Sequence, residues 1–387
     1  MNLCKKTALM LGALATMTAG IAAAQTPLTY DVKGASVTLY GDVDQYLNFM
    51  HSSSGKNLTA LEDGAYLRTR LGLHGEKNVG DGYTAKFALE QGLYSTSGAQ
   101  ADSSRLFDRQ AWFGIATPVG EFRAGRQNSV LLVRGGYIDN TSRTLGSVIN
   151  AFGVPSRYDS DLAYISPRME GFLFEAHYSL QGSAVGSTTN QGVYQLALDY
   201  QNGPYQVGYA GLGGKPPAGS LYTKNVTYDN LFADYNYGRG KVYLAYVRSN
   251  NNSTTGSGTG LLYNGGSPLG NVGALMSGTD LGVYTTYDIP QISADYQVTQ
   301  KLRVGGLYGR IEDKSGTGKN ATGWNLAAYY DVLKDTMVYF EVNSLANSAN
   351  AGFRPSGSAG LSKTFTAAAD VNGQTIRGVQ AGFVYKF

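Results

Sequence analysis

Apolar and polar residues alternate with a period of two along most of this chain. The stretch from 83 to 90 is typical: one face carries Tyr83, Ala85, Phe87 and Leu89, and the other carries Thr84, Lys86, Ala88 and Glu90. Successive side chains of a β-strand point to opposite faces, whereas helical spacing would mix the two sets. The pattern therefore predicts strands that have one apolar face and one polar, charged face.

We expect about sixteen such strands, joined alternately by short turns and by long stretches rich in Gly, Ser and Asn. The expected strands cover residues 36–49, 65–77, 82–95, 104–117, 120–131, 156–166, 171–180, 191–201, 204–212, 227–237, 241–250, 290–298, 301–312, 322–333, 336–345 and 375–387. The long connections are 50–64, 96–103, 132–155, 181–190, 213–226, 251–289, 313–321 and 346–374.

The two faces of these strands need different environments. Several apolar faces end in Tyr, Phe or Trp and carry Ala or Gly in the middle, which is typical of a wall that faces lipid. The other faces carry more charged residues than a dry core tolerates, so they face water. A sheet between hydrocarbon and water must close on itself, because lipid offers no partner for free edge groups. We therefore predict an all-β fold, a sixteen-stranded antiparallel transmembrane β-barrel around an aqueous channel.

Composition favours the barrel over a soluble β-sandwich, whose buried faces would prefer Val, Ile and Leu. Tyr (29) outnumbers Phe (14) and Trp (2) together, which suits rings at a boundary between lipid and water. After residue 24 no uninterrupted apolar run approaches the roughly 18 residues that a membrane-spanning helix needs. A helical membrane protein is therefore excluded.

Charge and cysteine content narrow the function further. The chain has 31 Lys and Arg against 28 Asp and Glu, a near balance that fits neither a nucleic-acid binder nor an acidic disordered tail. The only cysteine is Cys4 and the only histidines are His51, His74 and His177, so disulfide scaffolds and Cys-based metal centres lack their ligands. We expect no cofactor and no metal site.

The first 24 residues have the features of a cleaved signal peptide. Lys5 and Lys6 form a positive region, residues 7–21 are uncharged and largely apolar, and three alanines at 22–24 satisfy the small-residue cleavage rule. We expect residues 1–24 to be removed on export and residues 25–387 to form a single barrel domain.

Several short motifs, taken in order, resemble the trimeric general porins of Gram-negative outer membranes, most closely their betaproteobacterial branch. The motifs are Val37 to Gly41, Arg70 to Glu76, Arg109 to Gly114, Gly125 to Ser129 and the aromatic C-terminus. The resemblance implies an outer-membrane homotrimer with one pore per subunit, whose third long loop, here about 132–155, folds inward and narrows the channel. It also implies that Phe383, Tyr385 and Phe387 act as a signal for the outer-membrane assembly machinery, and that membrane lipid surrounds the barrel.

The family's constriction pairs basic residues on the wall with acidic residues on the inward loop. Carried over by motif, the basic residues are Arg70, Arg109, Arg126 and Arg157. Alternation independently puts Arg70 on the polar face, but it leaves the faces of Arg109 and Arg126 ambiguous. Each arginine could instead be an ordinary charge on the water-filled face.

The third long connection departs from an acidic loop, because it contains one acid, Asp139, and two bases, Arg134 and Arg143. A narrow throat with low-dielectric walls focuses the field of its charges, so an excess of arginine raises the local anion concentration. We therefore expect anion preference. The polar-face residues Asp42, Asp44, Lys86, Glu90, Asp159 and Asp161 bear on this expectation, and the acids among them oppose it.

The function expected from this pattern is passive diffusion of small hydrophilic solutes and ions, with no enzymatic activity. The alternative is a plugged surface barrel that serves as an adhesin or structural protein, which the long polar loops permit. A barrel enzyme would need a catalytic histidine near the outer rim, where His51 is the one candidate.

Overall fold

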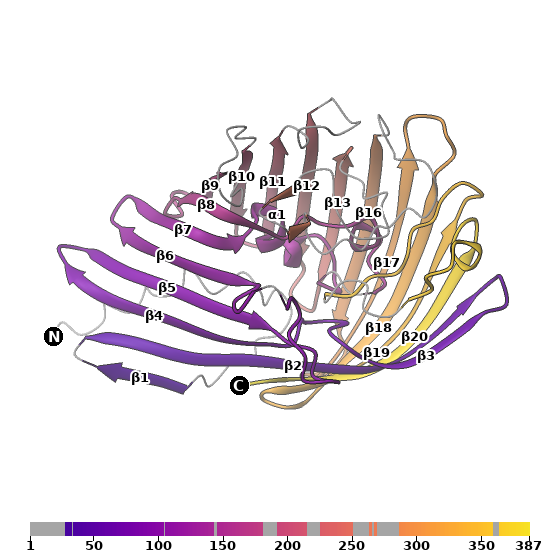
Figure 1. The fold of residues 1–387 in the computed structure, drawn as a ribbon, viewed down its shortest axis with the longest axis horizontal. Helices are drawn as coiled ribbons and strands as arrows, with labels where there is room; N and C mark the ends of the chain where they lie inside the picture. The colour runs from indigo at the N-terminus through magenta and orange to yellow at the C-terminus, as the bar shows by residue number, and fades with distance from the viewer. Residues whose placement is uncertain are drawn as a thin grey trace.

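The computed structural model describes residues 28–32, 34–103, 105–142, 145–180, 192–214, 225–250, 263–264, 267–268, 286–358 and 364–387. Its main element is one antiparallel sheet of 18 strands, of which sixteen form a closed ring and two short ones extend it (Figure 1). This confirms the predicted sixteen-stranded barrel. The predicted signal peptide lies outside the described residues.

The sixteen ring strands follow one another in chain order. They are β2 (Ala35–Ser52), β4 (Arg70–Gly80), β5 (Tyr83–Gly92), β6 (Gln110–Thr117), β7 (Gly120–Asn128), β8 (Arg157–Ile165), β9 (Phe172–Ser179), β10 (Val193–Asn202), β11 (Tyr205–Gly214), β12 (Val226–Asn236), β13 (Lys241–Ser249), β16 (Tyr287–Gln297), β17 (Leu302–Asp313), β18 (Ala321–Leu333), β19 (Thr336–Asn347) and β20 (Thr375–Lys386). A separate pair, β14 (Tyr263–Asn264) and β15 (Ser267–Pro268), lies outside the ring sheet.

The first and last ring strands close the barrel. Strand β2 pairs with β20 from Asp42 opposite Lys386 to Ser52 opposite Ile376. The C-terminal residue completes this seam, because Phe387 and Gly41 exchange two backbone hydrogen bonds of 3.0 and 3.1 Å. No free sheet edge is left in the ring, as a wall in hydrocarbon requires.

Two short strands that the sequence pattern missed pair with the ends of the long β2. Strand β1 (Leu28–Val32) pairs with its first residues, and β3 (Asn57–Asp63) pairs with its last ones, inside a stretch predicted to be a connection. At 18 residues β2 is longer than its ring neighbours, so its two ends have backbone groups that these strands satisfy.

Several predicted strand ends differ from the observed ones, and side chains explain two of the differences. Strand β4 begins at Arg70 instead of 65, because the Asp44 carboxylate accepts hydrogen bonds of 2.7 Å from the amides of Tyr66 and Leu67 and bends that segment away from the sheet. Strand β7 ends at Asn128 instead of 131, because Ser129 caps a helix there. Strand β6 begins at Gln110 instead of 104.

The two faces of the ring differ as the alternation predicted. On the outside Leu47, Leu196, Leu326 and Phe340 are between 44 and 56% exposed, while Asn48 on the inner face is buried. Tyrosines and a tryptophan also stand on the outer face, namely Tyr178, Tyr194, Tyr246, Tyr308 and Trp324. None of the helices in the described part of the chain is long and apolar enough to span a membrane.

The helices that the structure describes are short, and three of them belong to one connection. They are α1 (Val130–Val133), η2 (Gly135–Tyr137) and α2 (Val148–Phe152), and a fourth, η3 (Ala368–Asp370), precedes β20. Figure 1 shows α1 within the ring of strands, and both α1 and α2 contact several wall strands. The connection between β7 and β8 therefore positions the site described next.

Candidate functional site: a throat inside the barrel

The segment from Ser129 to Ser156, here called the inner segment, is tied at both ends to one point of the wall. The Ser129 amide donates to the Ser156 carbonyl over 2.8 Å, and the Ser129 hydroxyl donates to the Pro155 carbonyl over 2.6 Å. The same hydroxyl accepts the Leu132 amide and so caps α1. These bonds bring the two ends together, so the segment leaves and rejoins the wall as a compact loop.

Apolar side chains of the inner segment pack on the inner wall. Phe152 lies between Tyr228, Tyr287 and Phe353, with ring centroids 6.2, 5.3 and 6.3 Å away. Val130 and Ile149 belong to the same buried cluster, which includes inward residues of β10 to β13, β16 and β17. Part of the inner face is thus a dry contact, whereas alternation alone assigned all of it to water.

Asp139 holds the middle of the inner segment. Its carboxylate accepts hydrogen bonds from the Thr141 amide (2.9 Å) and hydroxyl (2.7 Å), the Ser147 hydroxyl (2.7 Å) and the Gln291 side chain of β16 (3.0 Å). Ser147 also caps α2 through the Asn150 amide, and Gly153, with φ of 106°, ends that helix. Asp139 therefore stabilises the loop fold and does not line the open space.

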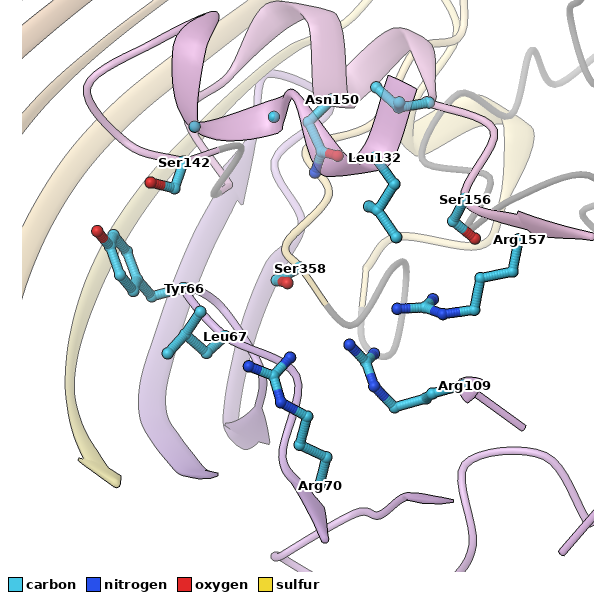
Figure 2. Close-up of a pocket in the computed structure, with 13 residues that line it drawn as sticks. Tyr66, Leu67, Arg70, Arg109, Leu132, Ser142, Asn150, Ser156, Arg157 and Ser358 are labelled. Atoms are coloured by element: carbon cyan, nitrogen blue, oxygen red, sulfur yellow. The ribbon is translucent and has the colours of Figure 1, made fainter. Parts of the chain in front are cut away.

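A cavity of about 50 Å³, here called the throat, lies between the inner segment and the wall residues Arg70, Arg109 and Arg157 (Figure 2). Three arginines, Arg70, Arg109 and Arg157, point their guanidinium groups into it. The remaining lining residues are Tyr66, Leu67, Leu132, Gly135, Gly136, Ser142, Asn150, Val154, Ser156 and Ser358. None of the lining residues is acidic.

Two carboxylates lie behind the first two arginines. Arg70 Nη2 is 2.5 Å from Asp42 and its Nε is 3.5 Å from Glu90, while Arg109 Nε is 2.6 Å from the other oxygen of Glu90. Tyr40 donates a further hydrogen bond of 2.8 Å to Glu90. Asp42 and Glu90 thus partly neutralise the arginines, as their expected place on the polar face had suggested.

Arg157 differs from its two neighbours. It makes no ion pair with any residue that the structure describes, and its Nε has no hydrogen-bond partner there. Of the three arginines that line this cavity, Arg70 and Arg109 are each paired with an acid, and Arg157 is the one without a paired acid among the described residues.

The other residues expected at the constriction lie elsewhere. Arg126 pairs with Asp159 at 2.6 Å and does not line the cavity. Lys86 pairs with Glu121 at 2.9 Å, four positions before Glu90 on β5. The guanidinium of Arg134 is buried against Glu175 and Asp199 of the wall and does not line the cavity. Arg143 lies outside the described residues.

The position of Arg109 resolves an ambiguity left by alternation. It precedes β6, whose outward residue Phe113 is 63% exposed, so the period of two does not apply to Arg109.

The three residues predicted to act in membrane assembly differ in their surroundings. Phe383 and Tyr385 are exposed on the outer face, whereas the backbone of Phe387 bonds to that of Gly41. Their role in assembly stays a prediction.

Sequence reasoning missed two stretches that complete the throat. The alternation predicts a strand through Tyr66 and Leu67, and the signal against it is Asp44, whose carboxylate accepts hydrogen bonds from their amides. The other stretch runs from 351 to 358 in the last long connection: the Asn150 side chain donates to the carbonyls of Ser356 and Gly357. No local pattern in the sequence links these distant segments.

The remaining chemistry of the described residues is sparse. No group of three or more His, Cys, Asp or Glu side chains among them could hold a metal ion. The rim histidine His51 shares a hydrogen bond of 2.8 Å with Asn57.

Comparisons with known proteins identify the family of this chain. A family model described as Gram-negative porin matches residues 8–350. An outer membrane porin protein of Bordetella pertussis is 30% identical over 268 residues, which is 62% of each chain. The major outer membrane protein P.IB of Neisseria gonorrhoeae is 30% identical over 207 residues, 51% of this chain and 56% of that protein. These matches span less than two thirds of either curated relative.

Solved structures share the fold at lower identity. An anion-selective porin from Comamonas acidovorans has a TM-score of 0.72 and 21% identity, and the match covers 91% of this chain and 100% of that one. The OmpT outer membrane protein of Vibrio cholerae, in a trimer form, has a TM-score of 0.64 and 18% identity, with 92% and 100% covered.

Proposed function

Because this chain belongs to the Gram-negative porin family, we propose that it forms a water-filled channel for passive diffusion of small hydrophilic solutes and ions. Its location is the outer membrane. Family membership also confirms that the chain is not an enzyme, since a porin carries out no reaction chemistry.

We further propose that the channel prefers anions, and the unpaired Arg157 is the observation that carries this. Paired charges largely cancel each other's field at a distance, so Asp42 and Glu90 offset Arg70 and Arg109. Arg157 has no such partner among the described residues, and its charge acts inside a confined space with low-dielectric walls. The anion-selective porin of similar fold from Comamonas acidovorans supports the same direction.

Planar-bilayer recording tests both statements. Purified protein should give ohmic current steps, and a KCl gradient should give a reversal potential of the sign set by chloride. Silent membranes, with the folded barrel shown to be inserted, would favour the plugged surface barrel. Steps with a cation-selective reversal potential would leave the channel intact and overturn its anion preference.

We propose that the protein assembles as a homotrimer, as the OmpT structure in its trimer form suggests by analogy. Lipid would contact the apolar outer face, and the assembly machinery would bind the terminal Phe383, Tyr385 and Phe387. Chemical cross-linking followed by denaturing electrophoresis tests the trimer, because the largest abundant product should have three times the monomer mass. A ladder that ends at the monomer would contradict it.

A further inference from the structure

Arg134, in the inner segment, is placed against the wall and differs in this from the throat arginines. Its side chain is 1% exposed, and it faces two carboxylates of neighbouring strands, Asp199 on β10 and Glu175 on β9. Its Nε and Nη2 donate to the two Asp199 oxygens over 2.7 and 2.9 Å, and its Nη1 donates to Glu175 over 2.7 Å. This is a bidentate pair with a second carboxylate, an arrangement that suits the planar guanidinium.

The network continues along the wall and back to the inner segment. His177 bridges the second oxygen of Glu175 (2.9 Å) and Asp161 (2.7 Å). Arg134 Nη1 also donates to the Val130 carbonyl over 3.1 Å, so the first turn of α1 is held by the same guanidinium. Burial acts to lower the pKa of Arg134, but Glu175 and Asp199 outweigh it and raise that pKa above its ordinary value.

The neighbours of Arg134 in sequence are the residues that line the throat. Leu132 precedes it and Gly135 and Gly136 follow it, and all three line the cavity. The backbone from Leu132 to Gly136 therefore lines the cavity, and the Arg134 side chain in its middle fixes it to β9 and β10. Any change in the Arg134 anchor is transmitted to this wall of the cavity through at most two peptide units.

We propose that Arg134 is a positioning residue that sets anion preference indirectly, by fixing the throat wall and by masking the wall carboxylates Glu175 and Asp199. The inference rests on the proposed channel function and deepens it. Without the guanidinium, two buried carboxylates behind the segment that lines the throat lose their shared counter-ion. Their field then opposes that of Arg157, and α1 loses the hydrogen bond that Arg134 donates to the Val130 carbonyl.

The main test compares three variants in planar bilayers with the purified full-length protein in a KCl gradient. Arg134→Ala should lower the chloride-to-potassium permeability ratio by about threefold and increase open-channel current noise. The triple variant Arg134→Ala, Glu175→Gln, Asp199→Asn should recover the ratio and keep the noise, because it lacks the anchor and also lacks the exposed charge. Arg248→Ala is the matched control: Arg248 makes a similar bidentate pair with Asp288, at 2.8 and 3.0 Å, but is exposed, and it should leave both readouts unchanged.

Asp199→Asn keeps the side-chain volume and decides the matter if Arg134→Ala does not assemble. It weakens the anchor and removes one negative charge, so we expect more noise with no fall in the permeability ratio. The inference would be overturned if Arg134→Ala had the same permeability ratio and the same current noise as the parent protein. If only Asp199→Asn folds, the same result in that variant would overturn it. If the triple variant keeps the low permeability ratio, the claim that Arg134 masks the charges of Glu175 and Asp199 is wrong. Failure of the parent protein itself to conduct would instead remove the proposed function.

Discussion

Two arginines of the same barrel, Arg157 and Arg134, show how partners decide what a charge does. Both are buried, at 7 and 1% exposure, and both lie at or within the connection between β7 and β8. Arg134 meets two carboxylates and a carbonyl and holds a backbone segment in place. Arg157 forms no ion pair with an acid among the described residues and points into the open cavity. The charge of Arg134 is therefore structural, and the charge of Arg157 is available to ions.

Arg70 lies between these two cases. It lines the cavity, as Arg157 does, but it is also paired with Asp42 at 2.5 Å, as Arg134 is with its acids. The comparison implies that selectivity should depend most on Arg157, and folding most on the paired arginines.

Reversing the charge of Arg157 should have the largest effect on ion selectivity. Arg157→Glu replaces the unpaired positive charge by a negative one and leaves the throat with more carboxylates than arginines. We expect the chloride-to-potassium permeability ratio to fall by about fivefold or more, measured as a reversal potential. A ratio within error of the parent would mean that Arg157 does not act on permeating ions.

Arg70→Ala should affect stability far more than Arg157→Ala. Loss of Arg70 leaves Asp42 buried without its arginine, although Glu90 keeps Arg109 at 2.6 Å. An uncompensated buried carboxylate costs about 3 kcal/mol, whereas loss of Arg157 leaves no unpaired acid behind. The difference is measured as the midpoint of unfolding in guanidinium chloride, with the folded fraction read from the mobility of unheated samples on gels. Equal midpoints for the two variants would contradict the distinction between paired and unpaired arginines.

Asp139→Ala should loosen the inner segment without exposing a wall carboxylate. The variant loses four hydrogen bonds to a charged acceptor, which should cost about 2 kcal/mol. Current noise should rise while the anion preference stays the same or increases slightly. A clear fall in anion preference would show that segment position alone, without unmasked acids, controls selectivity.

Lys86→Gln should have the smallest effect. Lys86 is four residues from Glu90 along β5, about 13 Å, which exceeds the Debye length of about 10 Å at 0.1 M salt. It is also paired with Glu121 at 2.9 Å. We expect an unchanged reversal potential at 0.1 M KCl. A shift as large as that of Arg157→Glu would place the selectivity filter nearer the β5 turn than the cavity suggests.

Much of the barrel could be predicted from sequence because a membrane wall imposes a period of two on each strand. Strands β9 and β10 begin and end within two residues of their expected bounds, and the burial of Glu175 and Asp199 between more exposed neighbours follows the same period of two. The rule is local, so it failed where a side chain competes with the sheet, as Asp44 does at Tyr66 and Leu67.

The site could be predicted only in part, because residue type does not reveal partners. Arg70, Arg109 and Arg157 were expected at the constriction and line the same cavity. Arg134 was expected there too, since it lies in the right connection, but its acids come from strands more than 40 residues away in sequence. Such pairings depend on how the ring closes, which no local pattern specifies.

The salt dependence of selectivity in the unmodified channel tests the electrostatic origin of anion preference most directly. Reversal potentials would be measured at a fixed KCl ratio while the absolute concentration is raised from about 0.03 to about 1 M, which shortens the Debye length from roughly 20 to roughly 3 Å. An unpaired arginine in the throat predicts a preference for chloride that is largest at low salt and declines steadily as salt rises. A preference for potassium, or a chloride preference that does not change with salt, would contradict it.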